Sequence, residues 1–249
     1  RSFVAWNWVA NGGTTASNGD GSITSTVQAN TTAGFSIVQY TGNGGNSSAT
    51  IGHGLSSPPS WILLKFLDVA GNWTVYHKSV GNTARLSLNL NSQADTSSSY
   101  FNNTSPTSSV FTVGSSFNQS TVYDYVAYCW HAVEGFSKFS SYSANNNTDG
   151  TFVYTGFKPA FVMVKNIDSA YSWFMFDNKR DTFNPVSHFL SADQTTVYSS
   201  QAVLDFLSNG FKIRVGNASG ANHLTNTHIY MAFAEHPFIG NGISPATAR

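Results

Sequence analysis

The stretch that decides the fold is Pro59-Ser60-Trp61-Ile62-Leu63-Leu64-Lys65, because it returns a hundred residues later as Pro159-Ala160-Phe161-Val162-Met163-Val164-Lys165. Each stretch begins with a proline and continues as a nearly unbroken apolar run of strand length. Runs of this kind are typical of central β-strands that are covered on both faces. Matching motifs continue in the same order on either side of the two stretches.

Four further pairs of segments repeat along the chain. They are Gly34–Tyr40 with Gly135–Tyr142, Trp73–Tyr76 with Trp173–Phe176, Val110–Val113 with Gly210–Ile213, and Tyr125–Tyr128 with Tyr230–Phe233. Chance does not supply so many pairs in one order at a nearly constant offset, so the sequence predicts a tandem duplication of one β-rich unit. Repeat 1 is predicted to cover residues 34–134, repeat 2 residues 135–239, and a surface tail residues 240–249.

The start of the chain resembles the last segment of each repeat. Phe3-Val4-Ala5-Trp6 matches Tyr125–Tyr128, which closes repeat 1. Residues 1–8 are therefore predicted to be the closing strand of an upstream unit, which implies that the chain begins inside a longer protein. Residues 9–33 are predicted to be a connector, with Ile23 and Val27 as its apolar anchors.

Each repeat has seven or eight short apolar segments separated by turn residues such as Asn209-Gly210, which is typical of an all-β domain. The fold class predicted is two tandem β-sandwiches related by duplication, with a jelly roll as one form that the pattern allows. The exception is Ser200–Leu207, which is predicted to form a short helix. The matching stretch Ala94–Ser109 is predicted to be a loop.

The composition excludes several functions. Charged residues are only 10% of the chain and the formal net charge is zero, whereas binding to nucleic acid needs clustered Lys and Arg. No apolar run approaches the 18 residues that indicate a membrane-spanning helix. A surface with so little charge has little electrostatic protection against association, so we expect a homo-oligomer.

Residues that could carry catalysis or hold a metal are few. The only two glutamates, Glu134 and Glu235, occupy nearly equivalent places in separate repeats and are not predicted to face each other. The seven histidines show no metal-binding spacing, and His77 corresponds to Asp177 in the second repeat. Two Asn/Asp-Gly segments lack the further acidic ligands of a calcium loop. We predict no enzyme activity, no catalytic residue, no metal and no cofactor.

The single Cys129 lies in an alternating stretch and is predicted to be a small buried side chain, with a reactive thiol as the alternative. Trp73 and Trp173 recur at one repeat position, which favours packing over sugar stacking. Aromatic and amide residues in nonrepeated loops are better ligand candidates, and the alternative is that such aromatics anchor their own loops. The candidate ligand-binding residues are Tyr100, Phe101, Asn102, Asn103, Phe117 and Tyr171.

Several phrases of the sequence are similar to a β-rich domain that is repeated in structural and tail-fibre-like proteins of marine bacteriophages. In the first half they are Asp20–Ser25, Ala33–Val38, Ile51–Leu55, Asn102–Phe111 and Tyr125–Cys129; in the second half they are Phe152–Phe157, Asp205–Lys212 and Tyr230–Phe238. The resemblance covers residues 3 to about 240. It carries no catalytic residues with it.

This resemblance implies a non-enzymatic protein of a virion appendage, located on the particle surface. Our leading hypothesis is the C-terminal part of a tail-fibre-like adhesin that binds uncharged host glycans by multivalency. The alternative is a purely structural virion module, such as a capsid decoration or fibre-building protein, that contacts only other virion proteins. A glycan-degrading enzyme is the third hypothesis, and the scarcity of acidic residues disfavours it. The resemblance also suggests trimers as the form of the homo-oligomer.

Overall fold

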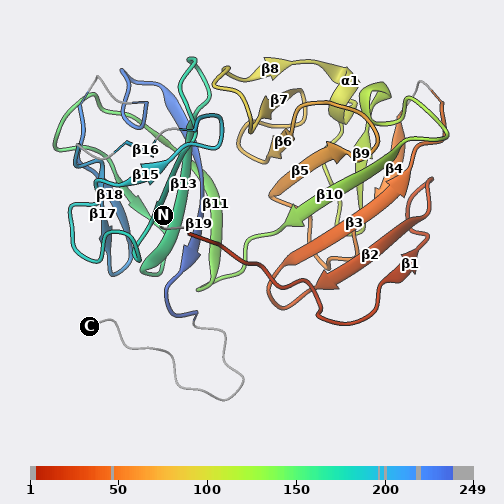
Figure 1. Cartoon of the computed structure of the whole chain (residues 1–249), viewed down its shortest axis with the longest axis horizontal. Helices are drawn as coiled ribbons and strands as arrows, with labels where there is room; N and C mark the ends of the chain where they lie inside the picture. Colours follow the sequence, from red (N-terminus) through yellow and green to blue (C-terminus); the bar gives the residue numbers. More distant parts are fainter. Residues whose placement is uncertain (1–3, 46–47, 196, 199–200, 217–219, 238–249) are drawn as a thin grey trace. The chain divides into compact units, whose positions relative to one another are not determined.

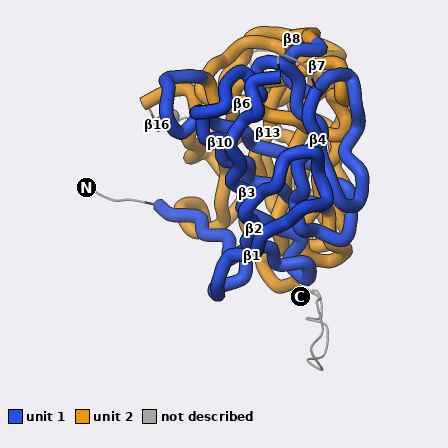
Figure 2. Tube along the Cα trace, turned by 90° about the vertical axis from the view of Figure 1, so that its right-hand side faces the viewer, with its two compact units in different colours: residues 1–71, 98–131 blue, residues 72–97, 132–249 orange. Residues whose placement is uncertain are grey.

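The computed structural model describes residues 4–45, 48–195, 197–198, 201–216 and 220–237, and it is an all-β protein with antiparallel sheets (Figure 1). The chain divides into two compact units. Unit 1 contains residues 1–71 and 98–131, and unit 2 contains residues 72–97 and 132–249 (Figure 2). The predicted tail 240–249 lies outside the described residues.

Unit 1 contains two groups of strands and two single helical turns. Its elements are β1 (Ala16–Asn18), β2 (Ser25–Asn30), β3 (Phe35–Thr41), β4 (Ala49–Gly52), β5 (Trp61–Phe66), α1 (Ser98–Phe101), β9 (Val110–Val113), the 3-10 turn η1 (Ser115–Phe117) and β10 (Asp124–Trp130). Five strands pair in the order β1-β2-β3-β10-β5, and β4 pairs with β9.

Side chains from one face of β10 lie in the core of unit 1. Tyr125, Ala127 and Cys129 are all fully buried, as expected for side chains that share one face of a strand. The Tyr125 ring contacts Tyr40 on β3, with ring centroids 5.0 Å apart, and Phe117 in η1, with centroids 5.8 Å apart. Cys129 is free, and burial raises the pKa of its thiol. The prediction that Cys129 is a small buried side chain is therefore confirmed.

Unit 2 is the larger unit. Its elements are β6 (Thr74–His77), β7 (Ala84–Ser87), β8 (Asp95–Thr96), β11 (Ser137–Ser143), β12 (Phe152–Tyr154), β13 (Pro159–Asn166), β14 (Phe174–Asp177), β15 (Phe189–Leu190), β16 (Val197–Tyr198), β17 (Leu204–Leu207), β18 (Gly210–Ile213) and β19 (Thr227–Ala234). One sheet has the order β11-β19-β13-β14-β15-β16, a second has the order β12-β18-β17, and β7 pairs with both β6 and β8.

The two sheets of unit 2 enclose one hydrophobic core. Val162 and Val164 from the first sheet and Phe211 and Ile213 from the second belong to the same cluster of buried side chains. The apolar run Phe161–Val164 lies in β13, between β19 and β14, as a continuous apolar run predicts. The β-sandwich is therefore the architecture that positions the loops of this unit.

The two halves of the sequence repeat their strand pairings and several contacts. β10 pairs with β3 and β5, and β19 pairs with β11 and β13, the matching strands of the second half. Asn118 and Asn43 exchange two hydrogen bonds of 2.8 Å, and Asn222 and Asn145 exchange equivalent bonds of 3.0 and 3.1 Å. A tandem duplication would produce such parallels, and the duplication stays a prediction from the sequence.

The compact units do not follow the predicted boundaries at every point. Residues 72–97, predicted within repeat 1, group with unit 2. The predicted connector 9–33 contains two strands, β1 and β2, because β2 pairs along its length with β3. Its predicted anchors Ile23 and Val27 are buried.

The strand expected over residues 1–8 is not present in the described residues 4–8. β10 and β19 are strands because each lies between two partner strands, and residues 4–8 have no such partners in the described part of the chain. Trp8 instead packs edge-on against Trp130, with ring centroids 5.9 Å apart.

The helix predicted at Ser200–Leu207 is wrong, since Leu204–Leu207 is strand β17. Leu207 pairs with Gly210 across a two-residue turn, so β17 and β18 form a hairpin. The sequence pair Asn209-Gly210 is typical of such a turn. The loop predicted at Ala94–Ser109 instead contains β8 and the turn α1. Phe101 is buried at the end of α1 and supplies the anchor for that turn.

Candidate functional site

The structure gives several of the predicted ligand-binding residues a place within their own loop. Phe101 and Phe117 are only 2% and 1% exposed, and the rings of Tyr100 and Phe117 lie 6.1 Å apart. Asn102 and Asn103 are exposed, but both have φ near 50°, a conformation that asparagine tolerates in turns. These residues of unit 1 therefore favour the alternative that the aromatics anchor their own loop.

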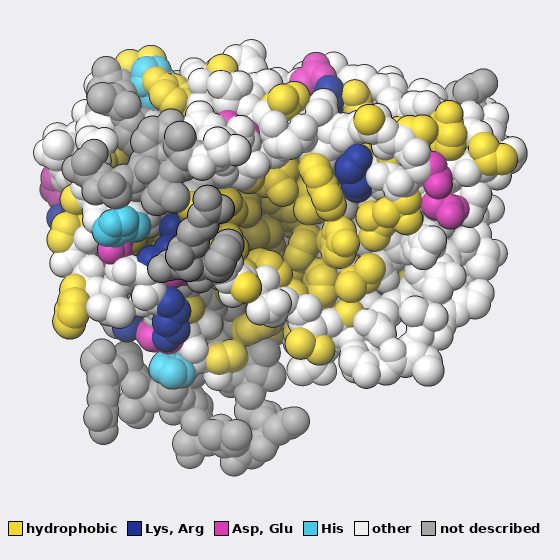
Figure 3. Space-filling view, viewed as in Figure 1, with side chains coloured by type: hydrophobic (Ala, Val, Ile, Leu, Met, Phe, Trp, Pro, Cys, Tyr) yellow, Lys and Arg dark blue, Asp and Glu magenta, His cyan; other side chains and the backbone are white. Residues whose placement is uncertain are grey.

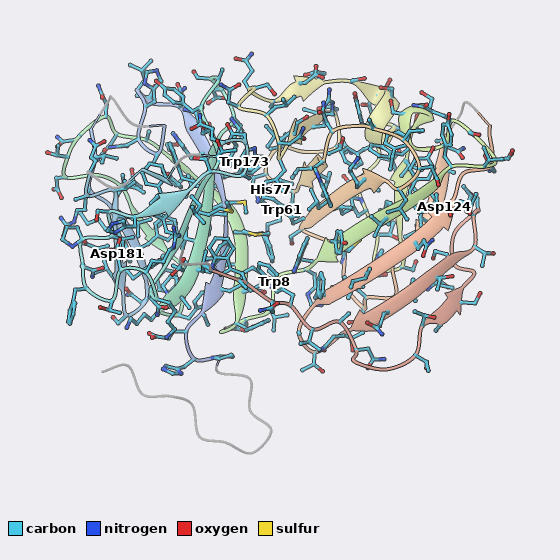
Figure 4. The ribbon with its side chains drawn as sticks, viewed as in Figure 1. Trp8, Trp61, His77, Asp124, Trp173 and Asp181 are labelled. Atoms are coloured by element: carbon cyan, nitrogen blue, oxygen red, sulfur yellow. The ribbon has the colours of Figure 1, made fainter. Side chains whose placement is uncertain are left out.

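Tyr171 in unit 2 is half-buried and already engaged. Its hydroxyl lies 3.0 Å from Nδ1 of His223, and its carbonyl accepts a hydrogen bond of 2.7 Å from Nζ of Lys165. Trp173 is fully buried and donates from Nε1 to the carbonyl of Ser87 at 2.9 Å. The packing interpretation of Trp173 is thus confirmed (Figure 4).

Glu235 and His77, which the sequence analysis considered for catalysis or metal binding, both form contacts within the fold. Glu235 forms an ion pair of 2.8 Å with Lys158, and the hydrogen bond from that lysine holds the pKa of Glu235 below its usual value. His77 is a buried histidine with hydrogen-bond partners. Among the residues that the structure describes, no three His, Cys, Asp or Glu side chains lie close enough to hold a metal ion together.

An aromatic residue that the sequence did not single out is the best candidate for a ligand contact. Phe183 lies in the loop of residues 178–188, which joins β14 to β15, and its side chain is 86% exposed. A phenylalanine this exposed is unusual, since aromatic side chains are mostly buried in cores. A defined ligand contact at this ring requires a loop with a fixed backbone.

The first part of this loop is held by Asp177, the last residue of β14. Its Oδ1 accepts hydrogen bonds from the amides of Lys179 and Arg180 at 3.0 and 2.9 Å. Its Oδ2 accepts a further bond of 2.6 Å from Nε of Arg180. Asp177 is buried, so this ion pair is shielded from solvent and fixes the start of the loop.

Asp181 holds the second part of the loop (Figure 4). Its Oδ2 accepts hydrogen bonds from the backbone amides of Ser187 and His188, each at 2.7 Å. Its Oδ1 lies 2.7 Å from Nδ1 of His188. Burial alone would raise the pKa of the Asp181 carboxyl, but the bonds from His188 and Ser187 outweigh burial and hold this pKa below its usual value. The carboxylate therefore ties the two ends of the loop together.

Asn184 fixes the chain directly after Phe183. Its Nδ2 donates to the carbonyl of Phe206 on β17 at 2.8 Å, and its Oδ1 accepts the amide of Phe206 at 2.9 Å. Asn184 thus ties the chain next to Phe183 to strand β17, and Asp181 ties the loop to itself at Ser187 and His188. The exposed ring therefore lies on a loop whose backbone is held by hydrogen bonds, which reduces the ordering of the loop that binding would require.

A pocket of about 380 Å³ lies beside Phe183, within unit 2. It is lined by this loop, with Asn178 and Lys179 contributing polar groups, and by the ion pair of Lys158 and Glu235. The arrangement combines one apolar ring with several donors and acceptors. Such a lining suits a small polar ligand with an apolar face.

One signal in the sequence could have located this loop. The connection from β14 to β15 covers residues 178–188, whereas the matching connection from β6 to β7 covers only residues 78–83. The connection in the second half of the chain is the longer one, and Phe183 lies inside it. Aromatics in nonrepeated loops are the ligand candidates that the sequence argument favours, so Phe183 fits the same criterion.

The fold defines the class of protein as an all-β sandwich protein. The family described as Domain of unknown function (DUF7483) matches residues 1–237, and the chain belongs to this family. No curated protein and no solved structure matches the chain. No helix in the described part of the chain is both long and apolar enough to cross a membrane.

Proposed function

We propose that this chain is a non-enzymatic saccharide-binding module of a virion appendage, which binds uncharged glycans of a host surface at Phe183. The observation that carries the binding proposal is the 86% exposed ring of Phe183 on a loop fixed by Asp181 and Asn184. The virion context rests on the resemblance of the sequence to phage tail-fibre-like proteins.

The chemistry of the site suits a neutral sugar. The C–H face of a pyranose ring packs on an aromatic face, and the sugar hydroxyls need donors and acceptors at the edge of that ring. Asn178 and Lys179 supply such groups beside Phe183. On the face drawn in Figure 3, charged side chains lie scattered among uncharged ones, as expected for a surface that recognises ligands without a net charge.

Replacing Phe183 with alanine should weaken glycan binding by about tenfold or more, because a central aromatic anchor carries most of the affinity of a small interface. A glycan array of neutral saccharides, followed by titration of the strongest ligand, measures the effect. Phe183→Tyr keeps the ring and should bind like the native protein. Val122→Ala removes another exposed apolar side chain, in unit 1, and should leave binding unchanged.

Equal binding by the native protein and Phe183→Ala would contradict the proposed site. If the native protein binds no saccharide, the purely structural virion module becomes the better hypothesis, because such a module contacts only other virion proteins. Release of reducing sugar from a bound polysaccharide would contradict the non-enzymatic proposal.

The proposed action depends on several copies being presented together, since weak single sites gain strength by avidity. We therefore expect the isolated chain to form a homo-oligomer, with a trimer as the form that the resemblance suggests. Sedimentation equilibrium at micromolar concentration checks this expectation. A stable monomer would count against multivalent binding by this chain alone, and it would leave the saccharide site at Phe183 testable as before.

A further inference from the structure

We propose that a second pocket of unit 2 binds an anionic group carried on a sugar ring, a carboxylate or a sulfate ester, between Lys78 and Lys138 and against the ring of Tyr154. This site is separate from the pocket at Phe183 and has a different chemistry. It extends the proposed function to acidic saccharides, and it can be tested whether or not neutral glycans bind.

The pocket has a volume of about 740 Å³, large enough for a monosaccharide. The start of β11 contributes Lys138, the end of β12 contributes Tyr154, and the turn after β6 contributes Lys78. Gly135 and Gly156 also line it and leave room, because they have no side chains. The pocket is therefore an open depression built from three elements of one unit.

The charges in this pocket favour an anion. Lys78 and Lys138 line it together with a single carboxylate, that of Glu134. Among the described residues neither lysine forms an ion pair. Burial lowers the pKa of the Lys78 ammonium, and the nearby charge of Lys138 lowers it further. An anion placed between the two ammonium groups would relieve this repulsion.

Tyr154 supplies the part of the pocket that would recognise a sugar ring. Its side chain is 58% exposed at the end of β12. Lys138 is fixed beside it, since Nζ donates to the Tyr154 carbonyl at 3.0 Å and lies 5.1 Å from the centre of the Tyr154 ring. One ammonium group thus lies next to an open aromatic surface, so a ligand can pack on the ring while its anionic group meets the lysine.

The test compares methyl glucuronide with methyl glucoside, which differ only in a carboxylate in place of a hydroxymethyl group. Binding is followed by amide chemical shifts of the full chain in low salt, with glucose 6-sulfate and inorganic sulfate as further probes. We expect the glucuronide or the sugar sulfate to shift the signals of residues 134–138 and 154–156 at concentrations where the glucoside does not. Lys78→Gln and Lys138→Gln should each weaken this binding about fivefold or more, whereas Lys65→Gln, which removes one charge from unit 1, should not.

Three results would overturn the proposal. The first is equal binding of the glucuronide and the glucoside, and the second is unchanged binding in both Lys78→Gln and Lys138→Gln. The third is binding of inorganic sulfate as strong as that of the sugar sulfate, which would show an anion site without saccharide recognition. None of these results depends on Phe183, so the failure of this site and the failure of the neutral-glycan site are distinguishable.

Discussion

Replacing Asn222 with aspartate should lower the free energy of unfolding by about 3–5 kcal/mol, the range expected when a buried charge is left without a partner. Asn222 is fully buried, and its Nδ2 donates to three oxygens: Oδ1 of Asn145 and the carbonyls of Asn147 and Val215, at 3.1, 2.8 and 2.6 Å. An aspartate of the same shape would place a carboxylate oxygen against these three acceptors. Urea unfolding at pH 7 measures the loss.

Two matched variants make this prediction specific. Asn118→Asp makes the same change at the equivalent position of unit 1, where Asn118 donates to Oδ1 of Asn43 at 2.8 Å, and it should also destabilise the protein. Asn146→Asp makes the change on an exposed residue and should alter the free energy of unfolding by less than about 0.5 kcal/mol. Similar stabilities for Asn222→Asp and Asn146→Asp would contradict the role assigned to the buried amide.

Acid should destabilise the protein as the pH falls below about 6.5, with His77 as a main cause. His77 is buried, its Nδ1 accepts the amide of Ser79 at 3.0 Å, and its Nε2 lies 3.4 Å from the carbonyl of Tyr230. Burial lowers the pKa of His77 to about 3, although the Tyr230 carbonyl acts in the opposite direction. The folded ring is therefore neutral over a pH range in which an unfolded histidine is charged.

The direction of the pH effect follows from that difference. Between pH 6.5 and about 3 the unfolded state binds a proton at His77 that the folded state does not bind, so stability falls as the pH falls. The contribution is at most about 1.4 kcal/mol per pH unit. Burial also lowers the pKa of His53 in unit 1, which adds to the same trend.

Urea unfolding at several pH values between 7 and 4 checks this prediction in matched variants. His77→Gln should show a shallower fall in the free energy of unfolding than the native protein does. His236→Gln makes the same change at an exposed histidine and is the control. A His77→Gln protein with the native pH dependence would show that His77 is not a source of the acid effect.

The sequence predicted the strands best where they are central. The apolar runs at Trp61 and Phe161 lie in β5 and β13, and most of their side chains are buried, as a continuous apolar pattern predicts. The exchange of His77 for Asp177 also has a physical explanation. Each side chain accepts the amide two residues later, at 3.0 Å in both cases, so either residue type fixes the turn that follows the strand. His77 is therefore a buried histidine whose ring is hydrogen-bonded.

The errors occurred where pairing or burial over long distances decides the structure. Leu204–Leu207 has residues that suit a helix, but pairing with β18 makes it a strand. Phe101 and Phe117 looked like loop aromatics available to a ligand, yet contacts between α1, η1 and β10 bury them. Phe183 was missed because one sequence does not show which loop aromatic will stay exposed. That outcome depends on Asp181 and Asn184, which bond to residues up to 22 positions away.

Saccharide binding at Phe183 is tested most directly by the amide spectrum of the full chain, recorded during titration with the neutral saccharide that binds most strongly on the array. We expect the signals of residues 178–188 to shift together, with Phe183 and Asn184 among the largest changes, and we expect the same titration of Phe183→Ala to leave them in place. Shifts confined to other parts of the chain, or equal shifts in the native protein and in Phe183→Ala, would contradict saccharide binding at Phe183.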